Sequence, residues 1–213
     1  TSVKDLKGKT ICLTGKGTTP DAALQYVLEQ NGLSKEDCVL EYKSEAAEVA
    51  AVLADNPDAV GLLPQPFVTS ALMQNEALKI VLDMNEEWNL VQKDDVLGKR
   101  AMIVTGVTIV RREFLEEQKG KVDDFLDAHT ASVAAVLGDV DTGAALAKEA
   151  GIVPKEEIAK KAIPQCSLVC ITGEEMADAL EGYLEVLFKF EPSLVGGEMP
   201  GMDFYYTADR QDQ

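Results

Sequence analysis

The sequence predicts an α/β fold in which short strands of a mostly parallel sheet alternate with helices. Three observations predict it. A strand, a glycine turn and a helix start follow one another at Lys9–Asp21; apolar runs and amphipathic segments then alternate as β-α-β-α-β-α-β; and the third apolar run ends at Pro64-Gln65-Pro66. Parallel strands are buried on both faces and therefore appear as short continuous apolar runs joined by helices, as they do here.

The segment Lys9–Asp21 reads KTICLTGKGTTPD. Ile11–Leu13 is an apolar run that predicts a buried strand, and Gly15–Gly17 predicts a turn. Thr18 and Thr19 before Pro20 predict a helix start, because Thr caps free N–H groups and Pro suits the first helical turn. Such a turn directs N–H groups and the positive end of the helix dipole to one point, which suits an anion or a polar acceptor. The segment is neither a dinucleotide fingerprint nor a P-loop, and a turn without a ligand is equally compatible with it.

The remaining elements of the first half follow from apolar spacing and from turn residues. A helix after Pro20 ends at Asn31-Gly32, and a helix capped by Ser44 ends at Asp55-Asn56-Pro57. A third helix begins near Phe67. The other strands are predicted at Cys38–Tyr42, Ala59–Leu63 and Leu78–Leu82.

The second half is predominantly helical. A polar connection at Lys93–Lys99 leads to a β-rich run at Ala101–Val110, and Ser167–Ile171 is a short extended segment. Helices are predicted at Glu113–Gln118, Val122–Leu137, Thr142–Ala150, Lys155–Ile163 and from a capping box at Thr172 to Phe190. We therefore expect two domains, an α/β lobe at 1–102 and a helical part at 103–213. The helical part has little sheet to cover, which suggests partner strands outside this chain.

Charge and composition narrow the function classes. The 213 residues contain 20 Lys and Arg against 37 Asp and Glu, a formal net charge of −17. This charge argues against binding to nucleic acid or to anionic membrane surfaces, both of which select basic patches. Hydrophobic residues make up 46% of the chain, enough for a core, and no apolar run is long enough to span a membrane.

Metal or cofactor chemistry is not expected from the cysteines and the histidine. The chain has four cysteines and one histidine: Cys12, Cys38, Cys166, Cys170 and His129. No two cysteines form a CxxC pair, so a zinc site is not expected. Cys12 and Cys38 fall in predicted strands and are expected to be buried free thiols. His129 lies on the apolar stripe of a predicted helix, which favours a packed residue over a ligand, and Trp88 is likewise expected to pack.

Several segments together resemble the substrate-binding proteins of ABC importers. They are SVKDLKGKTI, TGKGTTPDAALQYVLEQNGL, LLPQPFVTSAL, VLDMNEEWN and KAIPQCSLVCITGEEMADALEGYLEVLF. The similarity is to the cluster that takes aliphatic sulfonates, taurine, nitrate and thiamine precursors. It implies a type II periplasmic-binding fold, in which two α/β lobes close over a solute. It further implies one complete lobe here, plus the helical C-terminal part of the other.

The resemblance also implies which residues contact the solute. Gly15, Lys16, Gly17, Thr18 and Thr19 match the family's ligand-contacting loop at a helix N-terminus. Further matches are Pro64, Gln65 and Pro66 in a proline-flanked loop, and Thr105 and Gly106 on the hinge side of the cleft. Many relatives carry Glu at the position of Gln65, so a neutral amide there would change the charge preference for the ligand. Two simpler interpretations stay open: Lys16 as a solvated surface lysine, and Gln65 as a residue that only ties down its loop.

The resemblance implies a place and partners for the protein. It predicts an extracytoplasmic protein, periplasmic or lipid-anchored, that binds a small polar or anionic solute and delivers it to an ABC permease without catalysis or a cofactor. Relative to the family the chain lacks an N-terminal third, and it begins at Thr1, which suggests processing or trimming. A domain-exchanged homodimer is one way to supply the missing strands.

Two other functions on the same fold remain open. One is an enzyme of the thiamine-pyrimidine-forming type, which by resemblance requires a histidine and a cysteine-rich segment. The other is the effector-sensing domain of a transcription regulator, although no basic helix-turn-helix is present in the sequence.

Overall fold

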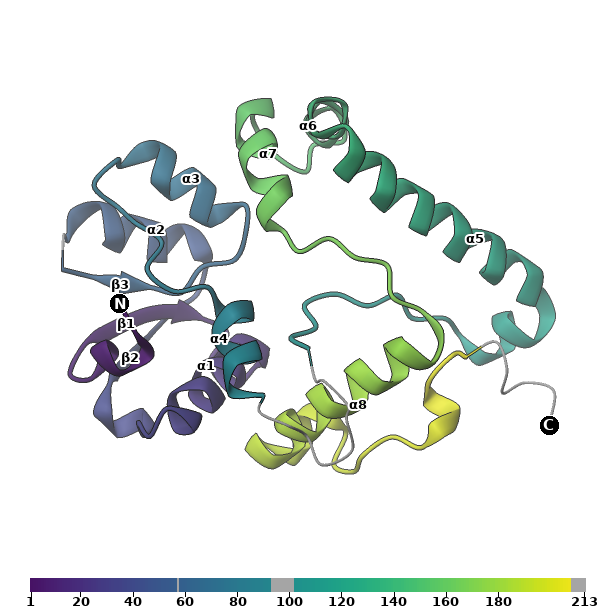
Figure 1. Cartoon of the computed structure of the whole chain (residues 1–213), viewed down its shortest axis with the longest axis horizontal. Helices are drawn as coiled ribbons and strands as arrows, with labels where there is room; N and C mark the ends of the chain where they lie inside the picture. Colours follow the sequence, from purple (N-terminus) through teal and green to yellow (C-terminus); the bar gives the residue numbers. More distant parts are fainter. Residues whose placement is uncertain (57, 93–101, 208–213) are drawn as a thin grey trace. The chain divides into compact units, whose positions relative to one another are not determined.

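The structure is a computed structural model that describes residues 1–56, 58–92 and 102–207 (Figure 1). Three sequence predictions fall wholly or partly outside these residues: the helix end at Pro57, the polar connection Lys93–Lys99, and the first residue of the run Ala101–Val110.

The chain divides into two compact units, each with its own packing. The first unit consists of Thr1–Leu63, Gln74–Thr105 and Ile171–Gln213, and the second consists of Pro64–Met73 and Gly106–Cys170. The predicted division into an α/β lobe at 1–102 and a helical part at 103–213 refers to the lobes of the family and stays a prediction.

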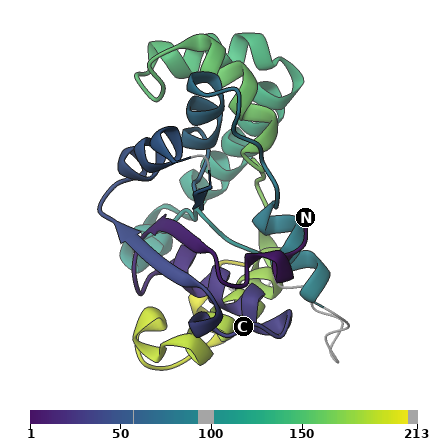
Figure 2. The ribbon, with the colours of Figure 1, turned by 90° about the vertical axis from the view of Figure 1, so that its left-hand side faces the viewer.

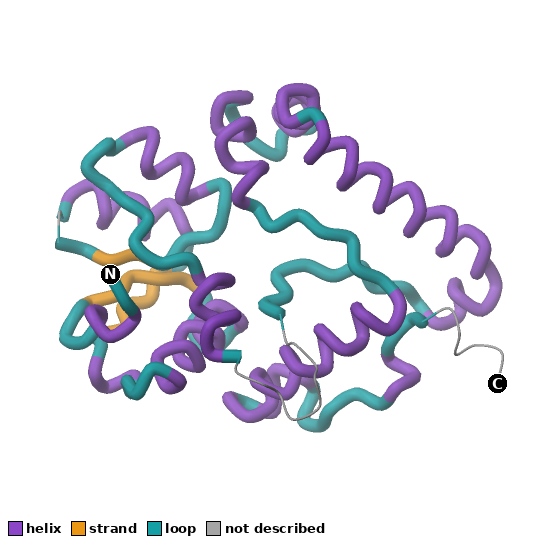
Figure 3. Tube along the Cα trace, viewed as in Figure 1, coloured by secondary structure: helices purple, strands orange, loops and turns teal. Residues whose placement is uncertain are grey.

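The first unit contains a three-stranded parallel sheet (Figure 3). Strand β1 (Thr10–Thr14) lies in the centre, with β2 (Val39–Lys43) on one side and β3 (Val60–Gly61) on the other. Cys12 is opposite Glu41 of β2 and Gly61 of β3. The three strands lie within a residue or two of the predicted runs, and the prediction of a parallel sheet is confirmed.

Two further strand predictions are wrong. Residues 78–82 and 102–110 form neither strand nor helix. Both segments contain large apolar side chains that stay exposed, Ile80 at 51%, Val81 at 50% and Ile109 at 85%. An apolar run becomes a strand only where a neighbouring strand supplies partners for its backbone groups, and no described strand lies beside these runs.

Helices cover both faces of the sheet (Figure 2). Successive residues of a strand point to opposite faces. Ile11 and Leu13 of β1 therefore pack against α1 (Thr19–Gln30), whereas Cys12 packs against α2 (Ala46–Asp55) on the opposite face. This double coverage explains why β1 is apolar at every one of its central positions.

Two other helices complete the apolar core on the α1 side, α4 (Met84–Val91) and α8 (Gly173–Phe190). Trp88 of α4 is fully buried, with its ring centroid 4.7 Å from that of Tyr26 and 5.6 Å from that of Tyr183. The predicted packing role of Trp88 is thus confirmed. Short 3-10 turns occupy Val3–Leu6, Lys35–Asp37, Pro192–Val195 and Met202–Phe204.

Two predicted helix caps are wrong in position or chemistry. Helix α2 has Glu45 rather than Ser44 at its N-cap. Thr172 occupies the N-cap of α8 as expected, but its side chain makes no capping hydrogen bond, so the predicted capping box does not form.

The second unit is helical. It contains α3 (Phe67–Gln74), of which only Gln74 belongs to the first unit. It also contains α5 (Arg112–Gly138), α6 (Val140–Glu149), α7 (Glu156–Ala162) and a 3-10 turn at Ile163–Gln165. Its small core lies between α6 and α7 and consists of Ala144, Val153, Ala159 and Ile163.

Helix α5 joins the two helices predicted at Glu113–Gln118 and Val122–Leu137. Gln118 has non-helical angles, φ −135° and ψ 35°, and marks the junction. Val122 is buried, but Phe125 on the predicted apolar face is 50% exposed, and its ring centroid lies 5.7 Å from that of His129.

Candidate functional site

The loop Gly15–Thr19 lies where the sequence predicted it, between the end of β1 and the start of α1. The chain leaves β3 at the same edge, where the Leu62 N–H donates to the Cys12 carbonyl at 2.9 Å. In parallel sheets this carboxyl edge is where ligands bind. The loop of the first unit therefore lies at the edge where parallel sheets usually bind ligands.

The loop is a closed turn. The backbone N–H and the hydroxyl of Thr18 both donate to the Gly15 carbonyl, at 2.9 and 2.6 Å. Thr18 is the N-cap residue of α1, but its side chain makes no capping hydrogen bond, since its hydroxyl faces Gly15 instead. Gly15 and Gly17 have φ of 74° and 69°, values that favour glycine.

A buried carboxylate in the first turn of α1 holds the loop that precedes the helix. Asp21 is only 2% exposed and accepts three hydrogen bonds: from the Gly17 N–H at 2.8 Å, the Gln25 amide at 2.7 Å and the Tyr42 hydroxyl at 2.9 Å. All three partners are donors, which is what an ionised carboxylate accepts. Asp21 is not among the residues predicted for the site. The four-residue spacing of Asp21 and Gln25 on one helix face could have suggested the pair, but nothing local points to Tyr42.

Tyr42 links this carboxylate to the only cation of the loop. Burial, followed by the hydrogen bond to Asp21 and its negative charge, raises the pKa of Tyr42 to about 12. The Lys16 ammonium lies 5.4 Å from the centroid of the Tyr42 ring, a cation–π arrangement. Lys16 is otherwise exposed, so its charge is screened by solvent, while that of Asp21 is not.

A second buried polar group lies at the first turn of α1. Tyr183 of α8 is 3% exposed, and its hydroxyl has no hydrogen bond of good geometry in the described residues. Burial raises the pKa of Tyr183, and the Thr19 side chain beside the hydroxyl partly opposes that rise. Nothing in the local sequence connects Tyr183 with the loop, which lies more than 160 residues before it.

The proline loop of the second unit is held by Gln65. The Gln65 side-chain oxygen accepts from the N–H and the hydroxyl of the buried Thr69, at 3.3 and 2.8 Å, and its amide donates to Gln165 at 2.9 Å. The peptide bond before Pro66 is cis. Gln65 therefore ties down its loop. Contact of Pro64, Gln65 and Pro66 with a solute stays a prediction.

Thr105 and Gly106 end one unit and begin the other, and both are exposed in a segment without regular structure. Their predicted place on the hinge side of a cleft also stays a prediction.

Comparison with known families identifies the chain. The model of the family described as NMT1/THI5 like matches residues 1–141. The chain belongs to the NMT1/THI5 like family. A comparison with curated proteins finds no match.

Solved structures show the fold of this NMT1/THI5 like chain. An ABC transporter from Parabacteroides distasonis is 24% identical with a TM-score of 0.71, over 95% of this chain and 67% of that one. The periplasmic aliphatic sulphonate binding protein SsuA from Escherichia coli is 16% identical with a TM-score of 0.71, over 97% and 61% of the two chains. The alkanesulfonate-binding protein SsuA from Xanthomonas axonopodis pv. citri, bound to MOPS, is 18% identical with a TM-score of 0.61, over 94% and 62%.

These likenesses confirm the type II periplasmic-binding fold and the resemblance to ABC importer binding proteins. The NMT1/THI5 like chain spans roughly two thirds of the length of the structures that it resembles, 61% and 62% of the two SsuA chains. Within the described ranges, no helix combines the length and apolar character that crossing a membrane requires.

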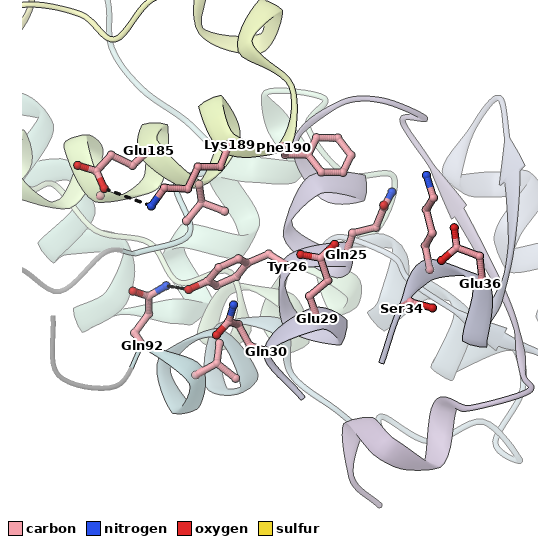
Figure 4. Close-up of a pocket in the computed structure, with 14 residues that line it drawn as sticks. Gln25, Tyr26, Glu29, Gln30, Ser34, Glu36, Gln92, Glu185, Lys189 and Phe190 are labelled. Atoms are coloured by element: carbon pink, nitrogen blue, oxygen red, sulfur yellow. Dashed lines mark hydrogen bonds and ion pairs between the residues drawn. The ribbon is translucent and has the colours of Figure 1, made fainter. Parts of the chain in front are cut away.

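The NMT1/THI5 like chain also has a cavity of about 760 Å³ in the first unit, between α1, α4 and α8 (Figure 4). Four of its polar side chains bind one another in two pairs. The Gln92 amide donates to the Tyr26 hydroxyl at 3.0 Å, and Lys189 pairs with Glu185 at 3.8 Å. The cavity borders the C-terminal half of α1, away from Gly15–Thr19, and we do not assign the solute to it.

The thiols of Cys12 and Cys38 lie in a buried rather than a reactive environment. Burial raises the pKa of Cys12 and Cys38, and the Cys12 thiol faces a Glu41 oxygen at 3.8 Å. A raised pKa lowers the fraction of thiolate, the form that attacks substrates and binds metals. No group of three or more His, Cys, Asp or Glu side chains in the described part of the chain could hold a metal ion.

Proposed function

We propose that this chain is the solute-binding component of an ABC importer, which captures a small polar solute outside the cytoplasm and delivers it to a permease. One observation carries the proposal: a closed glycine turn at the carboxyl edge of the central strand β1 leads directly into the N-terminus of α1. The fold supports it, since two of the similar structures are named as binding proteins for sulfonates.

The proposed solute contacts begin at Gly15, Lys16, Gly17, Thr18 and Thr19. Unpaired N–H groups at the first turn of a helix offer donors, and Lys16 adds an exposed cation at the surface of the loop. Pro64, Gln65, Pro66, Thr105 and Gly106 are the further contacts that the proposal includes. A binding protein of this kind works by population shift, because a solute that contacts the closed state more fully than the open one stabilises closure.

The charge of the chain supports a partner of opposite sign. A net charge of −17 creates a negative field around the protein. Such a field speeds encounter with a basic surface and repels other anionic surfaces. We propose that the permease presents basic residues where it receives this protein.

Binding without chemistry is favoured over the thiamine-pyrimidine type of enzyme. His129 packs against Phe125 on a helix surface, and the buried thiols of Cys12 and Cys38 have raised pKa values. Neither environment activates a side chain for nucleophilic or acid–base catalysis.

Calorimetry tests the proposal. The full chain is titrated with a panel of sulfonates, carboxylates, amides and pyrimidines, and at least one is expected to bind. In the variant Lys16→Ala we expect a loss of affinity of about fivefold, the scale of one solvent-exposed hydrogen bond from the ammonium group. Lys9→Ala is the matched control, since Lys9 is an exposed lysine just before the opposite end of the same strand.

A well-folded protein that binds no member of the panel would contradict the proposal. Equal losses of affinity in the Lys16 and Lys9 variants would show that the solute does not bind at this loop.

A further inference from the structure

The first turn of α1 already holds a negative charge of its own. Asp21 receives the Gly17 N–H at 2.8 Å, so one of the donors that a bound anion would use is occupied by a residue of the protein. As the third residue of α1, Asp21 also lies where the positive end of the helix dipole is strongest. An incoming anion would therefore meet a buried carboxylate at this helix N-terminus.

We propose that the solute group held by Gly15–Thr19 carries no negative charge and is an uncharged hydrogen-bonding group, such as an amide, a ring carbonyl or a hydroxyl. This inference rests on the proposed function and names the chemical class of its ligand. That class differs from the sulfonates named for two of the similar structures.

The two local charges do not cancel in their effect on a solute. Asp21 is 2% exposed and held by three donors, so its charge is fixed in a medium of low dielectric. Lys16 is exposed and rests over the ring of Tyr42, so water and salt screen its charge. Repulsion by Asp21 therefore outweighs attraction by Lys16 for an anion at the loop, and the net charge of −17 adds to the repulsion.

The Tyr183 hydroxyl independently points to a ligand at this turn. It is 3% exposed, lies beside Thr19 and makes no hydrogen bond of good geometry within the described residues. A buried hydroxyl without a partner is costly, so such a group is usually completed by water or a ligand. A hydroxyl can both donate and accept, which suits an amide or a hydroxyl of a solute as its complement.

The experiment uses inorganic sulfate as the probe and the backbone amide NMR signals of Gly15, Lys16, Gly17 and Thr19 in the full chain as the readout. In the unmodified protein we expect no saturable shift. In Asp21→Asn, which removes the charge but keeps an acceptor oxygen for the Gly17 N–H, we expect saturation, with an affinity at least about tenfold above any residual binding to the unmodified protein. Tyr42→Phe is the matched control: it removes one hydrogen bond to Asp21 but keeps the charge, and should exclude sulfate as the unmodified protein does.

Saturable sulfate binding by the unmodified protein would overturn the inference, and so would an Asp21→Asn protein that still excludes sulfate. If Asp21→Asn does not fold, Asp21→Ser, which keeps an oxygen acceptor, takes its place. A comparison of matched probes on the unmodified protein, nicotinamide against nicotinate and an alkanesulfonamide against its sulfonate, gives a second measurement. Tighter binding of the anionic member in both pairs would refute the inference, whereas failure of the proposed function shows as no binding of any solute in the calorimetric panel.

Discussion

The Tyr42 hydroxyl donates a hydrogen bond to a carboxylate oxygen of Asp21 at 2.9 Å. This bond joins β2 to the first turn of α1, and Asp21 in turn holds the Gly17 N–H of the loop. The position of the proposed binding loop therefore depends on Tyr42 of β2, which is 21 residues from Asp21 in the sequence.

Burial of Tyr42, together with its hydrogen bond to Asp21, should make stability depend on alkaline pH. The pKa of Tyr42 is raised to about 12, so the protonated phenol is favoured in the folded state. Its contribution is fully present below the ordinary tyrosine pKa of about 10 and is lost as the pH rises through about 12. Denaturant unfolding of the unmodified protein and of Tyr42→Phe across this range is expected to show a stability difference that shrinks as the pH rises. A difference that stays constant would contradict the assignment; Tyr26 and Tyr183 are common to both proteins and cancel.

Trp88 is expected to dominate the core of the first unit. It is fully buried between the rings of Tyr26 and Tyr183, so Trp88→Ala removes both ring contacts and leaves a cavity. We expect a loss of about 3 to 5 kcal/mol in the free energy of unfolding, measured by circular dichroism because the only tryptophan is gone. Leu90→Ala, at a 65% exposed position of the same helix, should change stability by less than about 0.5 kcal/mol. Comparable losses in the two variants would show that Trp88 is not the centre of this core.

Gly15 and Gly17 provide a paired test of the loop geometry. Both have positive φ, so alanine at either position costs about 1 kcal/mol or more. At Gly15 the added Cβ would also lie 2.5 Å from the Thr18 hydroxyl oxygen, whereas at Gly17 it would meet open space. We expect Gly15→Ala to lower the free energy of unfolding by about 1 kcal/mol more than Gly17→Ala. The reverse order would mean that the Thr18 hydroxyl does not close the turn as described.

Gln65 should matter for stability whatever it does for a solute. In Gln65→Ala the buried Thr69 hydroxyl loses its acceptor, which should lower the free energy of unfolding by about 1 to 2 kcal/mol. Gln74→Ala is the control. Gln74 is exposed at the end of α3, the helix that contains Thr69, and its replacement should have little effect on stability. Equal effects would show that the bond from Thr69 contributes nothing to the fold.

Local sequence predicted the parts of the fold that depend on local chemistry. The strand β1, the glycine turn and the start of α1 follow one another within a few residues, and each has a residue type that requires it. The run Leu78–Leu82 was predicted as a strand for its composition alone and is not one. A strand also needs a partner at hydrogen-bonding distance, and no property of these five residues specifies that partner.

The site was predicted in part for the same reason. The loop Gly15–Thr19 could be found from its glycines, but the residue that fixes its charge, Asp21, is buried by long-range contacts. Its partner Tyr42 comes from the next strand, and Tyr183 comes from a helix near the other end of the chain. A lone aspartate in a first helical turn normally reads as an exposed capping residue, so only the packing reveals it as a buried charge.

The order β2-β1-β3 leaves two outer strands in the described sheet, and unpaired strand edges invite neighbouring molecules to add strands of their own. β3 is only two residues long, too short to serve as a template, and β2 carries the ion pair of Lys43 with Glu41 at 2.6 Å. Short or charged edges resist edge-to-edge aggregation. The short edge strand β3 and the charged edge strand β2 therefore disfavour the addition of strands from other molecules to this sheet.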